Sequence, residues 1–227
     1  METKIYHVTD PVKDHDIIVE AAECLRNGGL VAFPTDTVYA VAASVSNPDA
    51  VDKLFEVKER PKDNPVSILV ARDRDYHLFV DIINPNNQFM ADLVEAFWPG
   101  PLTIIMPRIL AQVPSNVTAG SKNVGVRQPD NDIARAIIDE LGVAVAAPSA
   151  NISGHPSPTT GQHVIDDLGG KIDMIIVGPD CKEGIESTIV DLSEDAPILL
   201  RKGAITKEQI QAVIPRKIHE VPAEDSL

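Results

Sequence analysis

The sequence lacks the features of membrane-spanning and secreted proteins. No apolar run approaches the roughly 20 residues that a membrane helix needs. The first residues do not form a positively charged start followed by an apolar stretch, as a secretory signal would. The cysteines Cys24 and Cys181 show neither CxxC nor metal-site spacing. We therefore predict a protein of the reducing cytoplasm, without membrane association and without a metal held by its own side chains.

Basic and aromatic residues are also scarce. Lysine and arginine number 20 against 34 acidic residues, which gives a formal net charge of −14. Proteins that grip duplex nucleic acid usually carry a basic surplus, so we expect direct binding of such partners to be weak or absent. A small anionic ligand can still bind in a local basic pocket, because close charges outweigh distant charges that salt screens.

Two common kinds of catalytic site are missing as well. Neither usual glycine-rich phosphate loop occurs, and no histidine has a diagnostic spacing to Ser149, so a Ser-His-Asp hydrolase is not supported. The donors for any phosphorylated ligand must therefore be side chains and scattered backbone amides.

The chain does contain an alternation of helical and strand-like segments, without repeats or low-complexity linkers. Helices are predicted around residues 17–25, 48–58, 89–97, 133–141, 164–168 and 206–214, and strands around residues 30–33, 66–70, 102–106, 124–126, 143–147, 172–177, 187–192 and 198–200. Some strands are joined by connections too short for helical crossovers. We predict a single α/β domain over residues 1–215, with a twisted, mostly buried, mixed parallel and antiparallel sheet flanked by helices, and a short tail over residues 216–227.

Local end signals support several of these bounds. Asn47, followed by proline, has the pattern of a helix N-cap. Gly142 closes another helix, and Thr206 with Gln209 resembles a capping box. Trp98, between a helix and a proline-rich turn, is interpreted as a packing anchor.

Two short segments about ninety residues apart suggest phosphate chemistry. Lys58 and Arg60 concentrate cationic donors in an acidic chain, and Ser149 and Asn151 place a hydroxyl and an amide two residues apart. Fixed cations beside small polar donors suit a polyphosphate and the charge that grows in its transition state. The alternative for the cations is a solvated helix end. Two cations aimed at one ligand require the helix to stop there, and Pro61 supplies that stop.

Three polar clusters follow the C-terminal ends of predicted strands. They are residues 34–37 with Thr35 and Thr37, then Arg127, and then residues 148–151. Open α/β sheets bind ligands outside the carboxyl ends of their strands, so we expect these clusters to converge on one cleft. Taken alone, residues 34–39 could form only a turn, and Arg127 could form a surface salt bridge.

Seven ordered blocks resemble the YrdC family over roughly residues 10–214. They are PTDTVYAVAA (34–43), KERPKDNPVSILV (58–70), WPGPLT (98–103), NVGVRQP (123–129), APSANISGHPSPTT (147–160), ESTIVD (186–191) and ILLRKGAI (198–205). The resemblance implies a YrdC-like fold and the activity of an L-threonylcarbamoyladenylate synthase, which uses L-threonine, bicarbonate and ATP with Mg²⁺. The product feeds threonylcarbamoylation of tRNA by partner proteins. Longer relatives carry a further C-terminal domain, and we expect this chain to be a stand-alone YrdC domain.

The resemblance also implies roles for individual residues. Positions matching ATP contacts are Lys58, Arg60, Asn64, Asn123, Ser149, Asn151, Ser157 and Arg201, and positions matching threonine contacts are Thr35, Thr37, Arg127, Ala147 and Ser187. Lys58 and Arg60 are the expected catalytic charge stabilisers, with Mg²⁺ on the leaving pyrophosphate. The chain departs from the family at Ala40 and Ala42, where glycine is common, and at Leu69, where some relatives have histidine.

Two alternatives stay open. Related modules make carbamoyl adenylate from carbamoyl phosphate, but these usually lie in much longer chains. A YrdC-like fold could instead bind RNA on a concave basic surface, although the net charge of −14 counts against direct tRNA binding.

Overall fold

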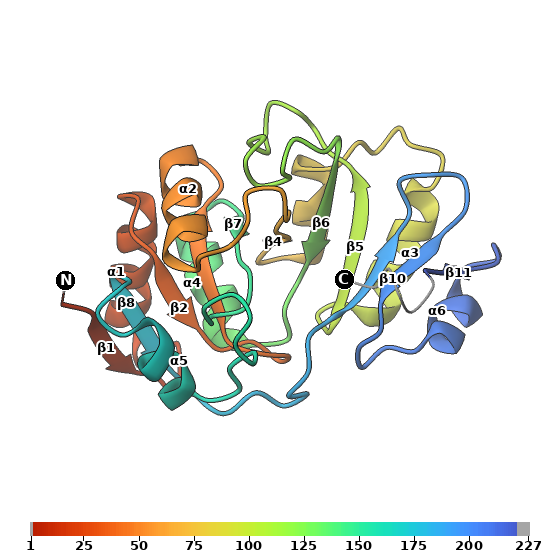
Figure 1. The fold of residues 1–227 in the computed structure, drawn as a ribbon. Helices are drawn as coiled ribbons and strands as arrows, with labels where there is room; N and C mark the ends of the chain where they lie inside the picture. Colours follow the sequence, from red (N-terminus) through yellow and green to blue (C-terminus); the bar gives the residue numbers. More distant parts are fainter. Residues whose placement is uncertain (1, 222–227) are drawn as a thin grey trace.

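One mixed sheet of eleven strands runs through the molecule (Figure 1). The computed structural model describes residues 2–221, and its strands lie in the order β1-β8-β2-β3-β7-β4-β6-β5-β9-β10-β11. Their bounds are β1 (Lys4–His7), β2 (Val31–Phe33), β3 (Ala40–Ser44), β4 (Ile68–Leu69), β5 (Leu102–Pro107), β6 (Asn123–Arg127), β7 (Val145–Ala146), β8 (Met174–Val177), β9 (Thr188–Asp191), β10 (Ile198–Arg201) and β11 (His219–Glu220). The sheet contains both parallel pairs such as β4–β6 and antiparallel pairs such as β5–β6, which confirms the predicted mixed sheet.

Helices flank the sheet on both of its faces. They are α1 (His15–Arg26), α2 (Pro48–Val57), α3 (Asn87–Phe97), α4 (Asp132–Leu141), α5 (Gly161–Leu168), α6 (Lys207–Val213) and the 3-10 helix η1 (Asp73–Leu78). Successive strand residues point to opposite faces, so Phe33 packs in one apolar cluster with Ile18 of α1 and Ile137 of α4. Ala32 packs in the other cluster with Leu54 of α2. No helix within residues 2–221 has the length and apolar character that crossing a bilayer demands.

The predicted helix ends are confirmed in detail. The Asn47 side chain accepts a hydrogen bond from the Ala50 amide at 3.1 Å, and Gly142 ends α4 in the left-handed region at φ 80°. Thr206 and Gln209 form the reciprocal bonds of a capping box at the start of α6. These signals were readable because each cap involves residues only three or four positions apart.

Strand prediction was less complete. The predicted strands at 66–70 and 143–147 shorten to β4 and β7. β1 was missed because it is a mostly exposed strand with charged residues. β3 was missed because it is alanine-rich, and alanine is not enriched in strands. Ala40 and Ala42 lie in β3, and outside glycine the described positive φ angles occur at Glu59 and Ala119, so β3 needs no glycine-like conformation.

Part of the predicted tail is structured, which corrects the expectation for residues 216–227. His219 and Glu220 form β11, which pairs in parallel with β10, and the Ile218 side chain is fully buried. An apolar side chain that reaches the core and an open strand edge together hold this segment, and neither is visible in local composition. Residues 222–227 lie outside the described part of the chain.

The end of α2 sets the directions of the two predicted cations. The Arg60 amide bonds to the Phe55 carbonyl at 2.9 Å, and the Glu59 amide bonds to the Glu56 carbonyl at 3.1 Å. This is a Schellman motif, in which the residue after the C-cap is left-handed. Glu59 holds that position at φ 53°, where glycine is usual because it has no Cβ.

We expect Glu59→Gly to stabilise the protein. Glycine has no Cβ and so removes the steric strain of the left-handed backbone at residue 59. The free energy of unfolding, measured with urea, should rise by about 1 kcal/mol or less. Glu56→Gly is the matched control, because Glu56 is an exposed residue inside α2. There glycine should lower the free energy by about 1 kcal/mol. Equal destabilisation by both substitutions would contradict this account of the turn.

Candidate active site

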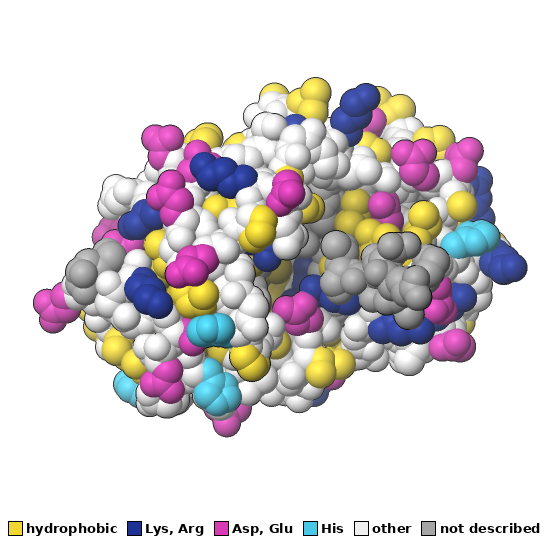
Figure 2. Space-filling view, viewed as in Figure 1, with side chains coloured by type: hydrophobic (Ala, Val, Ile, Leu, Met, Phe, Trp, Pro, Cys, Tyr) yellow, Lys and Arg dark blue, Asp and Glu magenta, His cyan; other side chains and the backbone are white. Residues whose placement is uncertain are grey.

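A cavity of about 490 Å³ opens where the loops after β2 and β7 approach β6, β9 and β10. Figure 2 shows the molecule hollowed near the middle of this face, with lysine and arginine atoms visible inside the hollow. The predicted site residues on its wall are Thr35, Thr37, Arg60, Asn64, Asn123, Arg127, Ala147, Ser149, Ser187 and Arg201. The three polar clusters therefore converge on one cleft, as predicted. The premise of a common sheet edge is wrong, however, because β6 is parallel to β4 and β4 is antiparallel to β7, so β6 runs opposite to β2 and β7.

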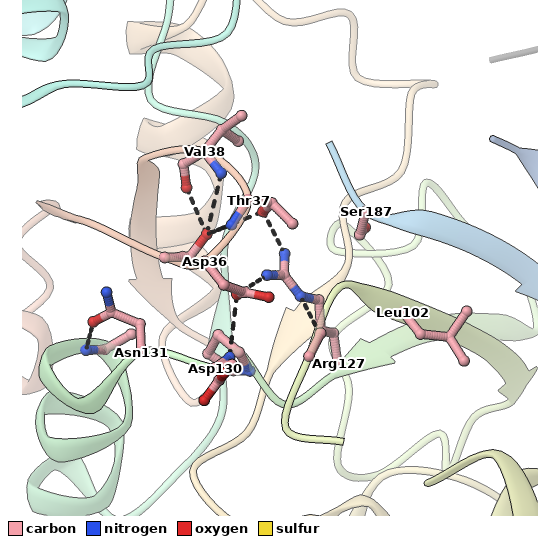
Figure 3. Close-up of polar contacts among 12 residues, drawn as sticks. Asp36, Thr37, Val38, Leu102, Arg127, Asp130, Asn131 and Ser187 are labelled. Atoms are coloured by element: carbon pink, nitrogen blue, oxygen red, sulfur yellow. Dashed lines mark hydrogen bonds and ion pairs between the residues drawn. The ribbon is translucent and has the colours of Figure 1, made fainter. Parts of the chain in front are cut away.

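Arg127 is held rigidly at one part of this wall. Its Nε donates to the Gly100 carbonyl at 3.0 Å and its Nη1 donates to the Thr37 hydroxyl at 2.8 Å. Its Nη2 forms an ion pair with Asp36, in which the two side chains are only 7% and 3% exposed (Figure 3). A guanidinium has five N–H donors, so N–H groups remain for a ligand. The surface salt bridge considered for Arg127 is thus excluded, because its partner is buried.

Asp36 links the Arg127 side chain to the loop that follows β6. Its Oδ1 accepts from the Asp130 amide at 3.1 Å as well as from Arg127, and its Oδ2 is buried without a hydrogen-bond partner. Burial lowers the pKa of Arg127, and Asp36 opposes that shift. Sequence reasoning did not select Asp36, although it lies between two selected residues, Thr35 and Thr37.

A second cation, Arg201, lies against the start of β9. Its Nε and Nη2 donate to the carbonyl and hydroxyl oxygens of Ser187 at 2.9 and 3.1 Å, and its Nη1 pairs with Glu186. The other Glu186 oxygen accepts from the Ser157 hydroxyl at 2.8 Å. Ser157 therefore lies behind Glu186 and does not line the cavity. Glu186 lines the cavity and was also missed, although it precedes Ser187 directly.

Arg60 closes the loop that follows α2. Its Nε donates to the Asn64 carbonyl at 3.0 Å, and its Nη2 donates to the Asn64 side chain at 2.7 Å and to the Pro65 carbonyl at 2.8 Å. Burial lowers the pKa of Arg60, Glu186 opposes the shift, and Arg201 adds to it. Arg60 and Arg201 line the same cavity, and the charge of Arg201 acts on Arg60 there.

Lys58, in contrast, lies behind the wall. Its side chain is among the fully buried ones and its Nζ donates to the carbonyl oxygens of Ser149 and Asn151. Burial, and to a smaller extent the charge of Arg60, lowers the pKa of the Lys58 amine to about 7. The structure therefore does not aim both cations of residues 58–60 at one point in the cavity.

Two predicted amides have other partners. The Asn151 side chain is buried and donates to the carbonyl oxygens of Ile152 and His155 at 3.0 and 2.8 Å. The Asn123 side chain lines the cavity and donates to the Ser193 hydroxyl at 2.8 Å. Asn151 therefore shapes its own loop, whereas Asn123 is open to a ligand.

The sequence is similar to that of known proteins along most of its length. The Sua5/YciO/YrdC family model, described as "Telomere recombination", matches residues 23–203. The threonylcarbamoyl-AMP synthase of Bacillus subtilis (strain 168) is 45% identical over 217 residues, which cover 94% of this chain and 62% of that one. The enzyme of the same name from Pyrococcus abyssi (strain GE5 / Orsay) is 42% identical over 212 residues, covering 93% and 61%. The chain thus spans less than two thirds of the length of these two relatives.

Solved structures give the same result. The crystal structure of P. abyssi Sua5 complexed with L-threonine superposes with a TM-score of 0.88 at 42% identity, covering 96% of this chain and 63% of that one. The structure of E. coli YciO superposes with a TM-score of 0.78 at 24% identity, over 92% of this chain and 100% of that one, which is a likeness of fold. With the family model and the relatives in agreement over most of its residues, the chain belongs to the Sua5/YciO/YrdC family.

Proposed function

We propose that this cavity converts L-threonine, bicarbonate and ATP into threonylcarbamoyl-AMP and pyrophosphate. The observation that carries the proposal is the arrangement of cations on one wall, with Arg127 fixed at one part and Arg60 and Arg201 at another. An amino acid and a polyphosphate each need an anion site, and the wall supplies two. The printed names of the B. subtilis and P. abyssi relatives, and the L-threonine complex of the latter, support this assignment.

Threonine is proposed to bind at the Arg127 end. The free N–H groups of Arg127 suit an amino-acid carboxylate, because a guanidinium matches that group with paired donors. Thr35, Thr37, Ala147 and Ser187 line the same cavity. The Thr37 hydroxyl already bonds to Arg127, and the Ser187 hydroxyl bonds to Thr103 at 2.8 Å. The hydroxyl groups of Thr37 and Ser187 are therefore held in place, ready to bind a small polar ligand.

ATP is proposed to bind along Arg60 and Arg201, with Asn64, Asn123 and Ser149 as further polar contacts. The threonine amine takes up the bicarbonate carbon as a carbamate, with loss of water. A carbamate oxygen then attacks the α-phosphorus, and the bond to pyrophosphate breaks. The protein's contribution in this scheme is positioning and stabilisation of phosphate charge by fixed cations, without a covalent step on a side chain.

Mg²⁺ remains part of the proposal as an ion carried by the nucleotide. Within residues 2–221 no group of three or more His, Cys, Asp or Glu residues could hold a metal, and the wall offers the carboxylates Glu186 and Asp191. Mg²⁺ commonly uses one or two carboxylates plus substrate phosphates, so this donor set fits it. When bound, the ion would supply neutralisation of charge on the leaving pyrophosphate.

The product's further use also stays a proposal. Threonylcarbamoyl-AMP is an activated acyl adenylate, so a partner protein that transfers its acyl group to tRNA must consume it. We also propose that the chain itself binds tRNA weakly or not at all, and that it acts in the cytoplasm.

The test is an assay of the purified chain with ATP, Mg²⁺, bicarbonate and L-threonine. We expect both pyrophosphate and threonylcarbamoyl-AMP, detected by a coupled phosphate assay and mass spectrometry. Replacing threonine and bicarbonate with carbamoyl phosphate tests the alternative in which the protein makes carbamoyl adenylate. A gel shift with tRNA over a salt series tests the alternative in which it binds RNA. If neither pyrophosphate nor the adenylate forms, the proposal is wrong.

Arg60→Ala should slow turnover far more than it weakens threonine binding. Loss of one fixed charge contact to a developing transition state typically costs about 3 kcal/mol, or about a hundredfold in kcat. Threonine affinity, measured by calorimetry, should change little. Arg72→Ala is the control, because Arg72 pairs with Asp139 away from this cavity. A kcat for Arg60→Ala within about threefold of the parent would remove Arg60 from the mechanism.

Asp36→Asn should destabilise the protein and weaken threonine binding. Neutralising Asp36 leaves the buried Arg127 charge unpaired, which should cost about 3 kcal/mol in the free energy of unfolding. Asp139→Asn is the matched control, since its pair with Arg72 is about half exposed, at 49% and 53%, and should cost less than about 1 kcal/mol. Urea unfolding and the threonine KM of both variants provide the comparison. If both variants lose the same free energy of unfolding, the burial of the Asp36–Arg127 pair does not contribute as proposed.

A further inference from the structure

Direct binding of phosphate does not explain why Lys58 is buried. Lys58 is not on the wall of the cavity, its side chain is only 1% exposed, and its Nζ points to two backbone carbonyls in a segment about ninety residues away. A cation meant to contact phosphate would keep its donors open to the cavity. Two of the three N–H donors of the Lys58 ammonium are instead occupied by the Ser149 and Asn151 carbonyls.

These contacts join the end of α2 to the segment 149–153 at several points. Besides the two bonds from Nζ, the Lys58 carbonyl accepts from the Ser153 amide at 2.8 Å. From the other side, Asp167 of α5 accepts from the Ile152 amide at 3.3 Å. The segment is thus held between α2 and α5, and Lys58 supplies the attachment to α2.

Ser149 is the member of this segment that reaches the cavity. A carbonyl oxygen carries partial negative charge, so a carbonyl turned toward the cavity would repel a polyphosphate. Lys58 binds the Ser149 and Asn151 carbonyls on the side away from the wall, and the Ala150 amide between them bonds to the Tyr39 carbonyl at 2.8 Å. These two carbonyls and the Ala150 amide are therefore paired within the protein, while Ser149 lies on the cavity wall.

We propose that Lys58 is a positioning residue, which fixes the backbone of residues 149–153 so that Ser149 faces the phosphates of ATP. The inference rests on the proposed function of the cavity. The left-handed Glu59 makes it possible, since it turns the chain between Lys58 and Arg60. Arg60 then lies on the wall and Lys58 behind it, so the two cations have different tasks.

Lys58→Met tests this inference, because methionine has a similar length but no N–H donors. We expect the KM for ATP to rise at least about tenfold and kcat to fall, with threonine affinity by calorimetry changed less than about threefold, a difference equivalent to more than about 0.7 kcal/mol between the two ligands. Hydrogen exchange of the 149–155 amides, followed by mass spectrometry, should become faster. Lys58→Arg, which keeps donors and charge, should recover part of the ATP KM.

Lys53→Met is the matched control. Lys53 also lies on α2, is part-buried and bonds to Asp173 at 2.8 Å, but it is not on the cavity wall. The Lys53→Met substitution should leave the KM for ATP and the hydrogen exchange of residues 149–155 unchanged.

Three outcomes would overturn the positioning role. Unchanged exchange at 149–155 with weaker ATP binding in Lys58→Met would indicate direct contact with phosphate. Equal loss of threonine and ATP binding, with faster exchange throughout the sheet, would indicate a general structural role. An ATP KM equal to that of the parent would indicate no role. Should the parent form no adenylate, the proposed function fails, whereas the exchange comparison still tests the attachment of residues 149–153.

A measurement on the unaltered chain covers the case in which Lys58→Met does not fold. In a crystal structure of the parent with a non-hydrolysable ATP analogue, Lys58 should keep its bonds to Ser149 and Asn151. A phosphate oxygen within hydrogen-bond distance of the Lys58 Nζ would overturn the proposal.

Discussion

The buried ion pair between Asp36 and Arg127 is the contact on which the cavity depends. It joins the loop after β2 to the end of β6 across 91 positions of sequence. A buried charge without a partner is costly, so each side chain requires the other to be in place. Gly100 adds a bond from a further loop, and Asp130 adds one from the loop that directly follows β6. The pair therefore orders three chain segments around one point, and the sheet topology brings them within reach.

The same wall explains how a strongly acidic chain could bind the anionic substrates proposed for it. The net charge of −14 describes the whole sequence, but the described cavity wall carries Arg60, Arg127 and Arg201 against Glu186 and Asp191. Charges within a few ångströms in a partly desolvated cavity act strongly, while exposed acids further away are screened. Burial lowers the pKa of all three arginines, yet an arginine remains charged in proteins. Local composition, and not the total charge, sets the ligand class here.

Neighbouring residues in the sequence can have separate tasks when a turn divides them. Lys58 and Arg60 are two positions apart, but the Schellman motif and the left-handed Glu59 send them in different directions. Arg60 closes its own loop at the cavity, and Lys58 enters the interior. A strained residue at this point is consistent with a conformation that the surrounding contacts determine.

The sequence by itself determined the α/β class and the helix ends, and most of the site residues that it suggested do lie on the cavity wall. Asn47, Gly142 and Thr206 act within a few residues of themselves, so their effects are readable without a fold. The residues near strand ends were expected to meet at one sheet edge. They do meet in one cleft, but β6 runs opposite to β2 and β7, so the strand order and the loops bring Arg127 to the other two clusters. The partners of Asp36 and Lys58 could not be read, because each lies about ninety positions away and depends on which strands become neighbours. The pairing of β11 with β10, and the placement of Lys58 behind Ser149, likewise follow from long-range packing, which a local pattern does not encode.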